Sequence, residues 1–208
     1  LGYPDTGYEL PELRVHEEVV SVDNSTAGTD RDGQVKMFRE AALGLADAAK
    51  ERRDNMSEKM ARVVEIINRP ENKDEHFLLW HDLEKEREEL CRVIPGCKAV
   101  YGSQNDEEAD KVISDFKDGR LKYLAAKPEM LGEGLNFQYH CHKAIMFIDY
   151  RFNDKFQAIA RIYRFMQKHP VDLYLVYAES EGEIYKSFMQ KWAQHREMVA
   201  NMTEIVRH

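Results

Sequence analysis

The sequence lacks an apolar run that approaches the roughly 18 residues of a membrane-spanning helix, and it does not begin like a signal peptide. It also has few cysteines, since Cys91, Cys97 and Cys141 are too few and too scattered for a disulfide framework. These absences predict a protein of a reducing compartment, cytoplasmic or nuclear, with no membrane partner. Basic residues are in the minority, with 30 Lys and Arg against 38 Asp and Glu and a net charge of −8. This balance argues against a general nucleic-acid-binding domain, which is usually basic.

A phosphate loop is also missing, because no Gly-x-x-x-x-Gly-Lys-Ser/Thr segment occurs in the chain. Residues 106–110, Asp-Glu-Glu-Ala-Asp, superficially look like an acidic box that would bind Mg²⁺. Because Asn105 precedes them as an N-cap, with a glutamate three residues on, we interpret them as the charged start of a helix. The His-Cys-His run at 140–142 predicts no metal site, since three adjacent residues cannot all bind one tetrahedral ion.

Short apolar runs bounded by polar turns predict strands near residues 77–80, 98–101, 121–126, 144–148 and 171–177. Helices are expected between them, and Gly119 is placed to end the helix that begins after Asn105. Residues 23–33 are rich in Ser, Thr, Asn, Asp and Gly and form a linker candidate, while residues 35–53 read as a helix. The alternation of strands and helices predicts an α/β fold of three layers, with a mainly parallel sheet and helices on both faces.

Residues 157–167 contain the most informative pattern. If they form a helix, Gln157, Arg161 and Arg164 share one face, and the apolar residues share another. The planar guanidinium of arginine suits phosphate oxygens. Two arginines placed in this way indicate stabilisation of charge on a transferring phosphoryl group. The alternative interpretation is an exposed helix face whose arginines are only solvated.

Three blocks of this chain resemble motifs of the Swi/Snf-type branch of superfamily two helicases. Residues 157–167, with the pattern Gln-x-x-x-Arg-x-x-Arg-x-x-Gln, resemble motif VI. Ala160 and Met166 stand where the family usually has Gly. Residues 127–138, which contain Gly-x-Gly-Leu-Asn, resemble motif V, and residues 76–82 resemble motif IV.

The resemblance covers about residues 60–200 and implies the C-terminal RecA-like lobe of an ATP-dependent DNA translocase or helicase. Residues 8–23 more loosely resemble the segment that joins the two lobes in this family. We divide the chain into an inter-lobe segment and linker at 1–33, a helical lead-in at 34–70 and the lobe at 71–208. The N-terminal lobe, which binds most of the ATP molecule, is expected elsewhere in the same protein. This chain alone is therefore expected not to hydrolyse ATP.

The resemblance also implies roles for single residues. The expected catalytic arginine fingers are Arg161 and Arg164. The expected nucleotide-binding residues are Gly132, Gly134, Asn136 and Gln157. The expected nucleic-acid-binding residues are His81, Ser103 and Lys127. ATP and Mg²⁺ are the implied cofactors, held mainly by an N-terminal RecA-like lobe, and double-stranded DNA is the other implied partner.

Two alternatives stay open. One is a related motor, either an RNA helicase or the motor of a restriction system. The RNA branch usually shows a His-Arg-x-Gly-Arg-x-x-Arg motif, which this chain lacks. The other is a non-catalytic helicase-like module that binds proteins, and the retained arginines and Gly-x-Gly-Leu-Asn loop speak against it.

Overall fold

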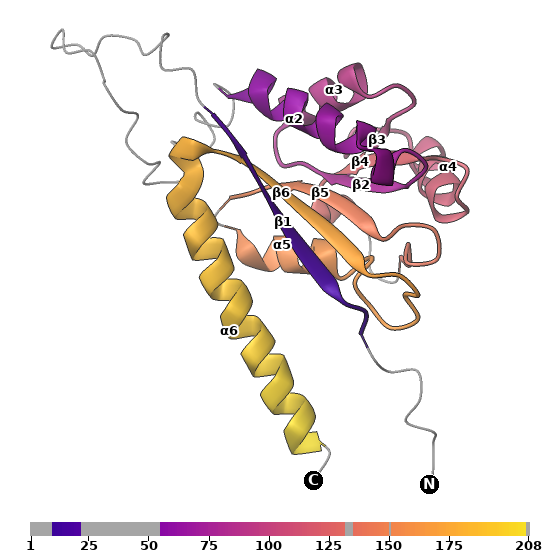
Figure 1. The fold of residues 1–208 in the computed structure, drawn as a ribbon. Coiled ribbons are helices and arrows are strands. Elements are labelled where there is room, and N and C mark those ends of the chain that lie inside the picture. The colour runs from indigo at the N-terminus through magenta and orange to yellow at the C-terminus, as the bar shows by residue number, and fades with distance from the viewer. Residues whose placement is uncertain (1–9, 22–54, 132–134, 150, 207–208) are drawn as a thin grey trace, which may run out of the picture.

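The computed structural model describes residues 10–21, 55–131, 135–149 and 151–206. The predicted linker at 23–33 and the predicted helix at 35–53 lie outside these residues. In the described part, six strands form one sheet in the order β1-β6-β5-β2-β4-β3 (Figure 1), and all neighbouring strands are parallel. The strands are β1 (Leu13–Val20), β2 (Phe77–Trp80), β3 (Lys98–Val100), β4 (Tyr123–Ala126), β5 (Lys143–Phe147) and β6 (Val171–Ala178). The five predicted strands and the parallel sheet are therefore confirmed.

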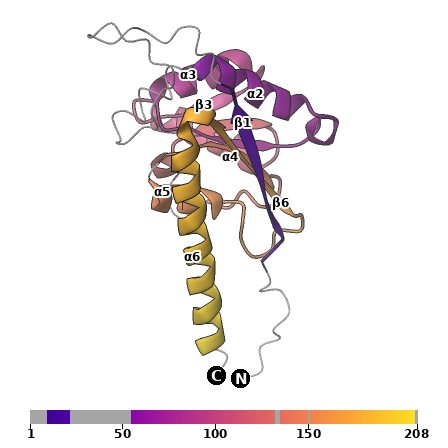
Figure 2. The same ribbon diagram turned by 60° about the vertical axis from the view of Figure 1, so that its left-hand side comes forward.

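Helices cover both faces of this sheet, as predicted. One face carries α2 (Met56–Asn68) and α3 (Glu84–Val93). The other carries α4 (Asp106–Lys117), α5 (Phe152–Ile159) and α6 (Gly182–Val206). Three short 3₁₀ helices, η2 (Pro70–Asn72), η3 (Pro128–Met130) and η4 (Glu179–Glu181), complete the described elements. Figures 1 and 2 show α6 continuing well past the end of the sheet.

Strands β2, β4, β5 and β6 are buried on both sides, so their residues alternate between two hydrophobic cores. Leu78 packs with α4, α5 and α6, while Leu79 packs with α2 and α3, and neither is more than 1% exposed. The predicted start and end of α4 are confirmed. The Asn105 side chain accepts a hydrogen bond from the Glu107 amide at 2.9 Å, and Gly119 follows with φ of 74°. No helix among the described residues combines the length and the apolar character needed to cross a membrane.

Strand β1 was not predicted. Its residues were assigned to the inter-lobe segment, yet they extend the sheet as an edge strand, from Leu13 opposite Val171 to Val20 opposite Ala178. Helix α2, which lies in the predicted lead-in, packs on the same sheet. The described parts of all three predicted segments therefore share one sheet and its two cores.

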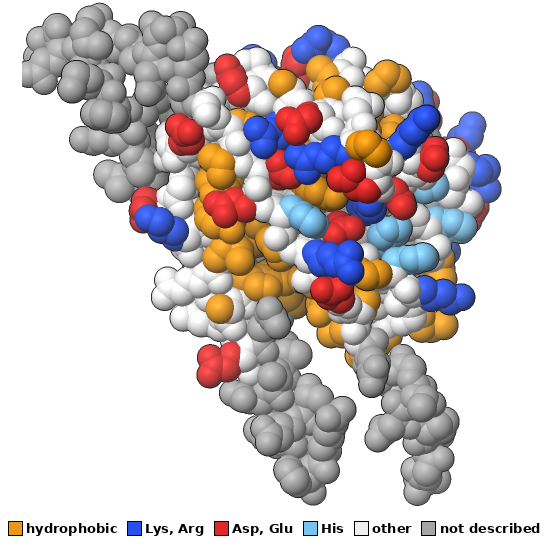
Figure 3. Space-filling view, in the orientation of Figure 1, with side chains coloured by type: hydrophobic (Ala, Val, Ile, Leu, Met, Phe, Trp, Pro, Cys, Tyr) orange, Lys and Arg blue, Asp and Glu red, His pale blue; other side chains and the backbone are white. Residues whose placement is uncertain are grey.

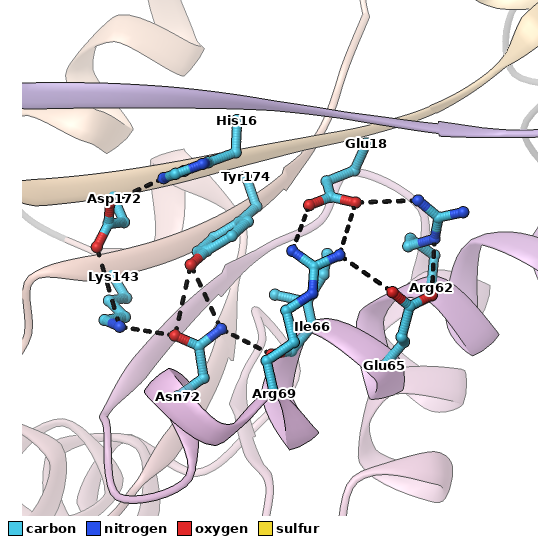
Figure 4. Close-up of polar contacts among 10 residues, drawn as sticks. All are labelled: His16, Glu18, Arg62, Glu65, Ile66, Arg69, Asn72, Lys143, Asp172 and Tyr174. Atoms are coloured by element: carbon cyan, nitrogen blue, oxygen red, sulfur yellow. Dashed lines mark hydrogen bonds and ion pairs between the residues drawn. The ribbon is translucent and has the colours of Figure 1, made fainter.

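Ion pairs attach β1 to α2 (Figure 4). The Glu18 carboxylate accepts hydrogen bonds from Arg69 at 2.6 Å and from Arg62 at 3.0 Å. Burial acts to raise the pKa of Glu18, but the hydrogen bonds from Arg69 and Arg62 outweigh it and hold the pKa below the usual value. Because Glu18 is almost fully buried, these ion pairs lie within the contact between the edge strand and α2.

A second polar network lies beneath the start of β6 (Figure 4). His16 Nε2 lies 2.8 Å from Asp172 Oδ1, and its ring stacks on Tyr174. Lys143 Nζ donates to Asn72 Oδ1 at 2.6 Å, and the Asn72 amide also meets the Tyr174 hydroxyl. This network ties β1, η2, β5 and β6 together at the end of the sheet where β5 and β6 begin.

Candidate functional site

The segment that resembles motif VI is not one helix. Helix α5 ends at Ile159, and residues 160–166 follow it as a series of turns and bends. The prediction that Gln157, Arg161 and Arg164 share a helix face is therefore wrong. Met166 has φ of 68°, a left-handed conformation that glycine adopts without strain, and it occupies a position where the family pattern usually has Gly.

The turns after α5 nevertheless bring both arginines to the segment that resembles motif V. Arg161 Nη2 donates to the Leu131 carbonyl at 3.0 Å, and the Phe137 amide donates to the Arg161 carbonyl at 3.4 Å. Arg164 Nη1 donates to Asn136 Oδ1. The β4–β5 and β5–β6 connections thus run side by side, and three of the predicted site residues meet between them.

Gln167 holds the other end of this pair of connections. Its buried side-chain amide donates to the Cys141 carbonyl at 3.0 Å, and its Oε1 accepts from the His169 amide at 3.0 Å. No role was predicted for Gln167, although its place in the motif pattern was the available signal. Gln167 is therefore a positioning residue that closes the turn carrying Arg164.

Arg164 differs from Lys155 and Lys127 in its pairing, because those two lysines contact carboxylates. Arg164 forms no ion pair with any residue that the structure describes, and it donates its hydrogen bond to the neutral side-chain amide of Asn136. By contrast, Lys155 contacts Asp82, and Lys127 Nζ lies 2.7 Å from Glu84 Oε1. Arg164 is half-buried. The hydrogen bond to Asn136 orients its guanidinium, and no carboxylate among the described residues offsets its charge.

The structure describes only two of the four predicted nucleotide-binding residues. Gln157 is exposed on α5, and Asn136 is half-buried beside Arg164. Gly132 and Gly134 lie outside the described residues. Within the described ranges, no group of three or more His, Cys, Asp or Glu side chains is placed to hold a metal ion.

The predicted nucleic-acid-binding residues lie at the carboxyl edge of the sheet, which is the side where the parallel strands end. Each of them follows the end of a strand: His81, Ser103 and Lys127. The His81 amide donates to the Ala126 carbonyl at 3.2 Å, which sets it beside Lys127. Ser103 is exposed and Lys127 is partly exposed. This edge is where open parallel sheets usually bind ligands.

The assignment of His81 to a nucleic-acid contact needs correction. The side chain is 0% exposed, and both ring nitrogens are buried with no hydrogen-bond partner among the described residues. Burial lowers the pKa of His81 to about 4, against the opposing effect of Glu86, Asp82 and Glu84. The residue is a neutral core histidine in this structure, a position that the apolar run before it did not reveal.

Replacing His81 with leucine is expected to flatten the acid dependence of stability. The folded-state pKa of about 4 lies below the ordinary histidine value of 6.5, so the unfolded chain binds the proton first as the pH falls. The stability present above pH 6.5 is therefore lost toward pH 4, by on the order of 2–3 kcal/mol for this residue. Urea unfolding of wild type and His81→Leu at several pH values measures the difference.

The matched control is His140→Gln, because it removes an exposed histidine in place of a buried one. At neutral pH, His81→Leu should also be more stable than wild type by about 1 kcal/mol, since it removes buried polar atoms without partners. Parallel pH profiles for wild type and His81→Leu would contradict the assignment of a depressed pKa.

A buried ion cluster under the carboxyl edge was not predicted as a unit. Lys155 is 0% exposed and contacts Asp82 Oδ2, with Asp149 Oδ2 at 3.9 Å. Arg151 donates to Asp82 Oδ1 at 2.8 Å and to Asp149 Oδ2 at 3.0 Å. Two acidic and two basic groups thus join the ends of β2 and β5 to α5.

The run at 140–142 does not converge on a common point. The Cys141 thiol is buried and donates to the Lys143 carbonyl at 3.2 Å. His142 Nε2 lies 3.5 Å from Glu75 and its ring stacks on His169, while the ring of His140 packs against Gly119.

Acidic and basic side chains are interspersed over the face of the molecule drawn in Figure 3.

No protein-family model matches the chain, and no curated protein matches it. Among solved structures, the C-terminal part of the Fun30 ATPase domain matches with a TM-score of 0.55 and 17% identity, over 64% of this chain and 45% of that one. A Dbp5 variant from S. cerevisiae bound to a Gle1 variant and IP6 matches with a TM-score of 0.53 and 14% identity, over 66% of this chain and 37% of that one. The C-terminal domain of the same Dbp5 variant, also in complex with Gle1 and IP6, matches with a TM-score of 0.54 and 14% identity, over 66% and 79%.

The chain spans less than half of the first two of these structures. The likeness shows the fold. The chain has a three-layer α/β fold of RecA-like type with a parallel sheet, as predicted, and it shares this fold with the C-terminal part of the Fun30 ATPase domain and the Dbp5 C-terminal domain.

Proposed function

We propose that this chain is the C-terminal motor lobe of an ATP-dependent DNA translocase, with Arg164 and Arg161 as its arginine fingers. The observation that carries the proposal is the setting of Arg164. Its guanidinium is held by the Asn136 amide and forms no ion pair with the described residues. A solvated surface arginine would need no such orientation, and a structural one would usually have a carboxylate partner.

A phosphate at this surface would meet a guanidinium whose positive charge is still available. A guanidinium already paired with a carboxylate has most of its charge cancelled, whereas one held by an amide oxygen keeps it. In the proposal, Asn136 orients Arg164 and the Leu131 carbonyl orients Arg161 toward the phosphates of ATP. ATP with Mg²⁺ supplies the phosphoryl chemistry, and the phosphate loop and Mg²⁺ ligands are proposed to come from an N-terminal RecA-like lobe.

The nucleotide side of the proposal includes Gln157, Gly132 and Gly134 in addition to Asn136. The DNA side consists of Ser103 and Lys127 at the carboxyl edge of the sheet, without His81. A chain with net charge −8 can still touch a duplex backbone through a narrow strip of this kind. Fold likeness at 14–17% identity does not choose among motor branches. The choice of a DNA translocase therefore rests on the motif patterns.

Lys127→Ala is expected to weaken binding to duplex DNA and to reduce the salt slope by about one phosphate contact. The matched variant is Glu84→Gln, because Glu84 pairs with Lys127 and lies on the surface. Freeing Lys127 should tighten DNA binding and steepen the slope. Fluorescence anisotropy at several salt concentrations measures both. Equal affinities for wild type and the two variants would exclude Lys127 from the DNA interface.

The proposal as a whole is tested by ATP hydrolysis of the protein that contains this lobe together with its N-terminal lobe. Turnover stimulated by duplex DNA is the expected result. Stimulation by RNA alone would favour an RNA helicase, and no turnover with any nucleic acid would favour a protein-binding module. This chain by itself should show no turnover above background, because its sequence has no phosphate loop.

A further inference from the structure

Two of the three cysteines lie side by side, although the sequence suggested that they were scattered. Cys91 lies near the end of α3, Cys97 lies just before β3, and their sulfur atoms are 3.9 Å apart. Both are free thiols. The turn between them is closed by a hydrogen bond from the Cys97 amide to the Ile94 carbonyl at 3.1 Å. Cys141, by contrast, is buried and donates to backbone carbonyls.

The two thiols are not equivalent. Cys91 is partly exposed, whereas Cys97 is buried. The hydrogen bond between the thiols, with help from Arg87 and Lys98 and against the effect of burial, lowers the pKa of Cys91 to about 7. The same hydrogen bond and burial raise the pKa of Cys97. This asymmetry suits one thiol that reacts with an external reagent and a second that resolves the product.

We propose that Cys91 and Cys97 form a redox-active dithiol that low-molecular-weight disulfides convert into an intramolecular disulfide. The Cys91 thiolate attacks one sulfur of oxidised glutathione, and the sulfur–sulfur bond of that reagent breaks to release one glutathione thiolate. Cys97 then loses its proton and attacks Cys91 Sγ, which expels the second glutathione. The dithiol loses two electrons and two protons, and one oxidised glutathione becomes two reduced glutathiones.

The turn between the two cysteines has room for this change. The sulfur atoms must approach from 3.9 Å to about 2 Å. Gly96 has φ of 79°, and apart from its chain neighbours no heavy atom of the described residues lies within 4 Å of where its Cβ would be, so none of them packs against that side of the turn. Strand β3 is also an edge strand that pairs only with β4 in the described sheet. A small shift at its start therefore disturbs one strand pairing and not two.

The experiment uses trypsin, because cleavage after Arg87, Arg92 and Lys98 separates the two cysteines. Cys91 falls in residues 88–92 and Cys97 falls in residues 93–98, so only a disulfide can join these peptides. The native chain is equilibrated with graded ratios of reduced and oxidised glutathione, alkylated and digested without reductant. The expected product is the joined pair of peptides, which dithiothreitol separates.

Cys97→Ser and Cys97→Ala should both stop at a mixed disulfide of glutathione with Cys91, and Cys91→Ser should give neither product. Cys141→Ser is the matched control and should form the joined peptides as wild type does. In the wild type, Cys91 should be alkylated at least ~100-fold faster than Cys141, whose pKa is raised to about 12 by burial.

Joined peptides that appear only after the chain is unfolded would overturn the proposal. So would Cys97 variants that accumulate no adduct at Cys91 while remaining folded by circular dichroism. Neither outcome bears on the proposed motor function, since the thiol pair lies apart from Arg161 and Arg164.

Discussion

Arg164→Ala is expected to reduce ATP turnover of the protein that contains this lobe by ~10²–10⁵-fold. The guanidinium would act on charge that develops during phosphoryl transfer, so the loss should fall on kcat. Stability should change little, because Arg164 is only half-buried and has one hydrogen bond to the Asn136 side chain. Affinity for duplex DNA should also stay near wild type. Steady-state hydrolysis, thermal melting and DNA anisotropy on the same preparations separate these three readouts.

Arg161→Ala should reduce turnover over the same range, but for a compound reason. Its guanidinium also holds the Leu131 carbonyl at 3.0 Å, so the substitution loosens the neighbouring connection as well. Arg120→Ala is the matched control, since Arg120 is exposed and pairs with Asp115 and Asp118 on the surface. Wild-type turnover in Arg164→Ala would leave only the interpretation of a solvated arginine.

Five strands could be predicted because each is a short and mainly apolar run. Such a run can be recognised from local sequence without knowing which distant residues it contacts. Strand β1 lacks that pattern. Glu18 interrupts it, and the partners that make this carboxylate acceptable in the sheet are Arg62 and Arg69, 44 and 51 residues later. Local periodicity cannot show a charge that is satisfied from so far along the chain.

The end of α5 was missed for a related reason. The spacing of apolar residues continues through Ile162, so the periodicity predicts a longer helix. The turns form instead where tertiary hydrogen bonds compete with helical ones, from Gln167 to the Cys141 carbonyl and from the Phe137 amide to the Arg161 carbonyl. The motif pattern predicted which residues come together, whereas the backbone conformation that does so depends on these contacts.

The ion cluster around Lys155 could not be predicted from local sequence either, since Lys155 and Asp82 are 73 residues apart.

This cluster also carries the largest expected effect on stability. Lys155→Met would leave the carboxylates of Asp82 and Asp149, 3% and 7% exposed, with Arg151 as their remaining basic partner in the cluster. Breaking a buried ion pair from one side typically costs about 3–5 kcal/mol, because an uncompensated charge stays buried. For a domain of this size the melting temperature should fall by roughly 6–20 °C.

Two further variants distinguish an electrostatic cause from a packing cause. Arg151→Met should cost only about 1 kcal/mol, since Arg151 is 43% exposed and water screens its charge. Adding Asp82→Asn to Lys155→Met should recover part of the loss, because one buried negative charge disappears. If Lys155→Met melted within about 2 °C of wild type, the cluster would contribute little net stability. If the double variant were less stable than Lys155→Met, packing of the Lys155 side chain would be the cause instead. An electrostatic result would mean that this cluster fixes α5, and with it the turn that carries Arg161 and Arg164, to the carboxyl ends of β2 and β5.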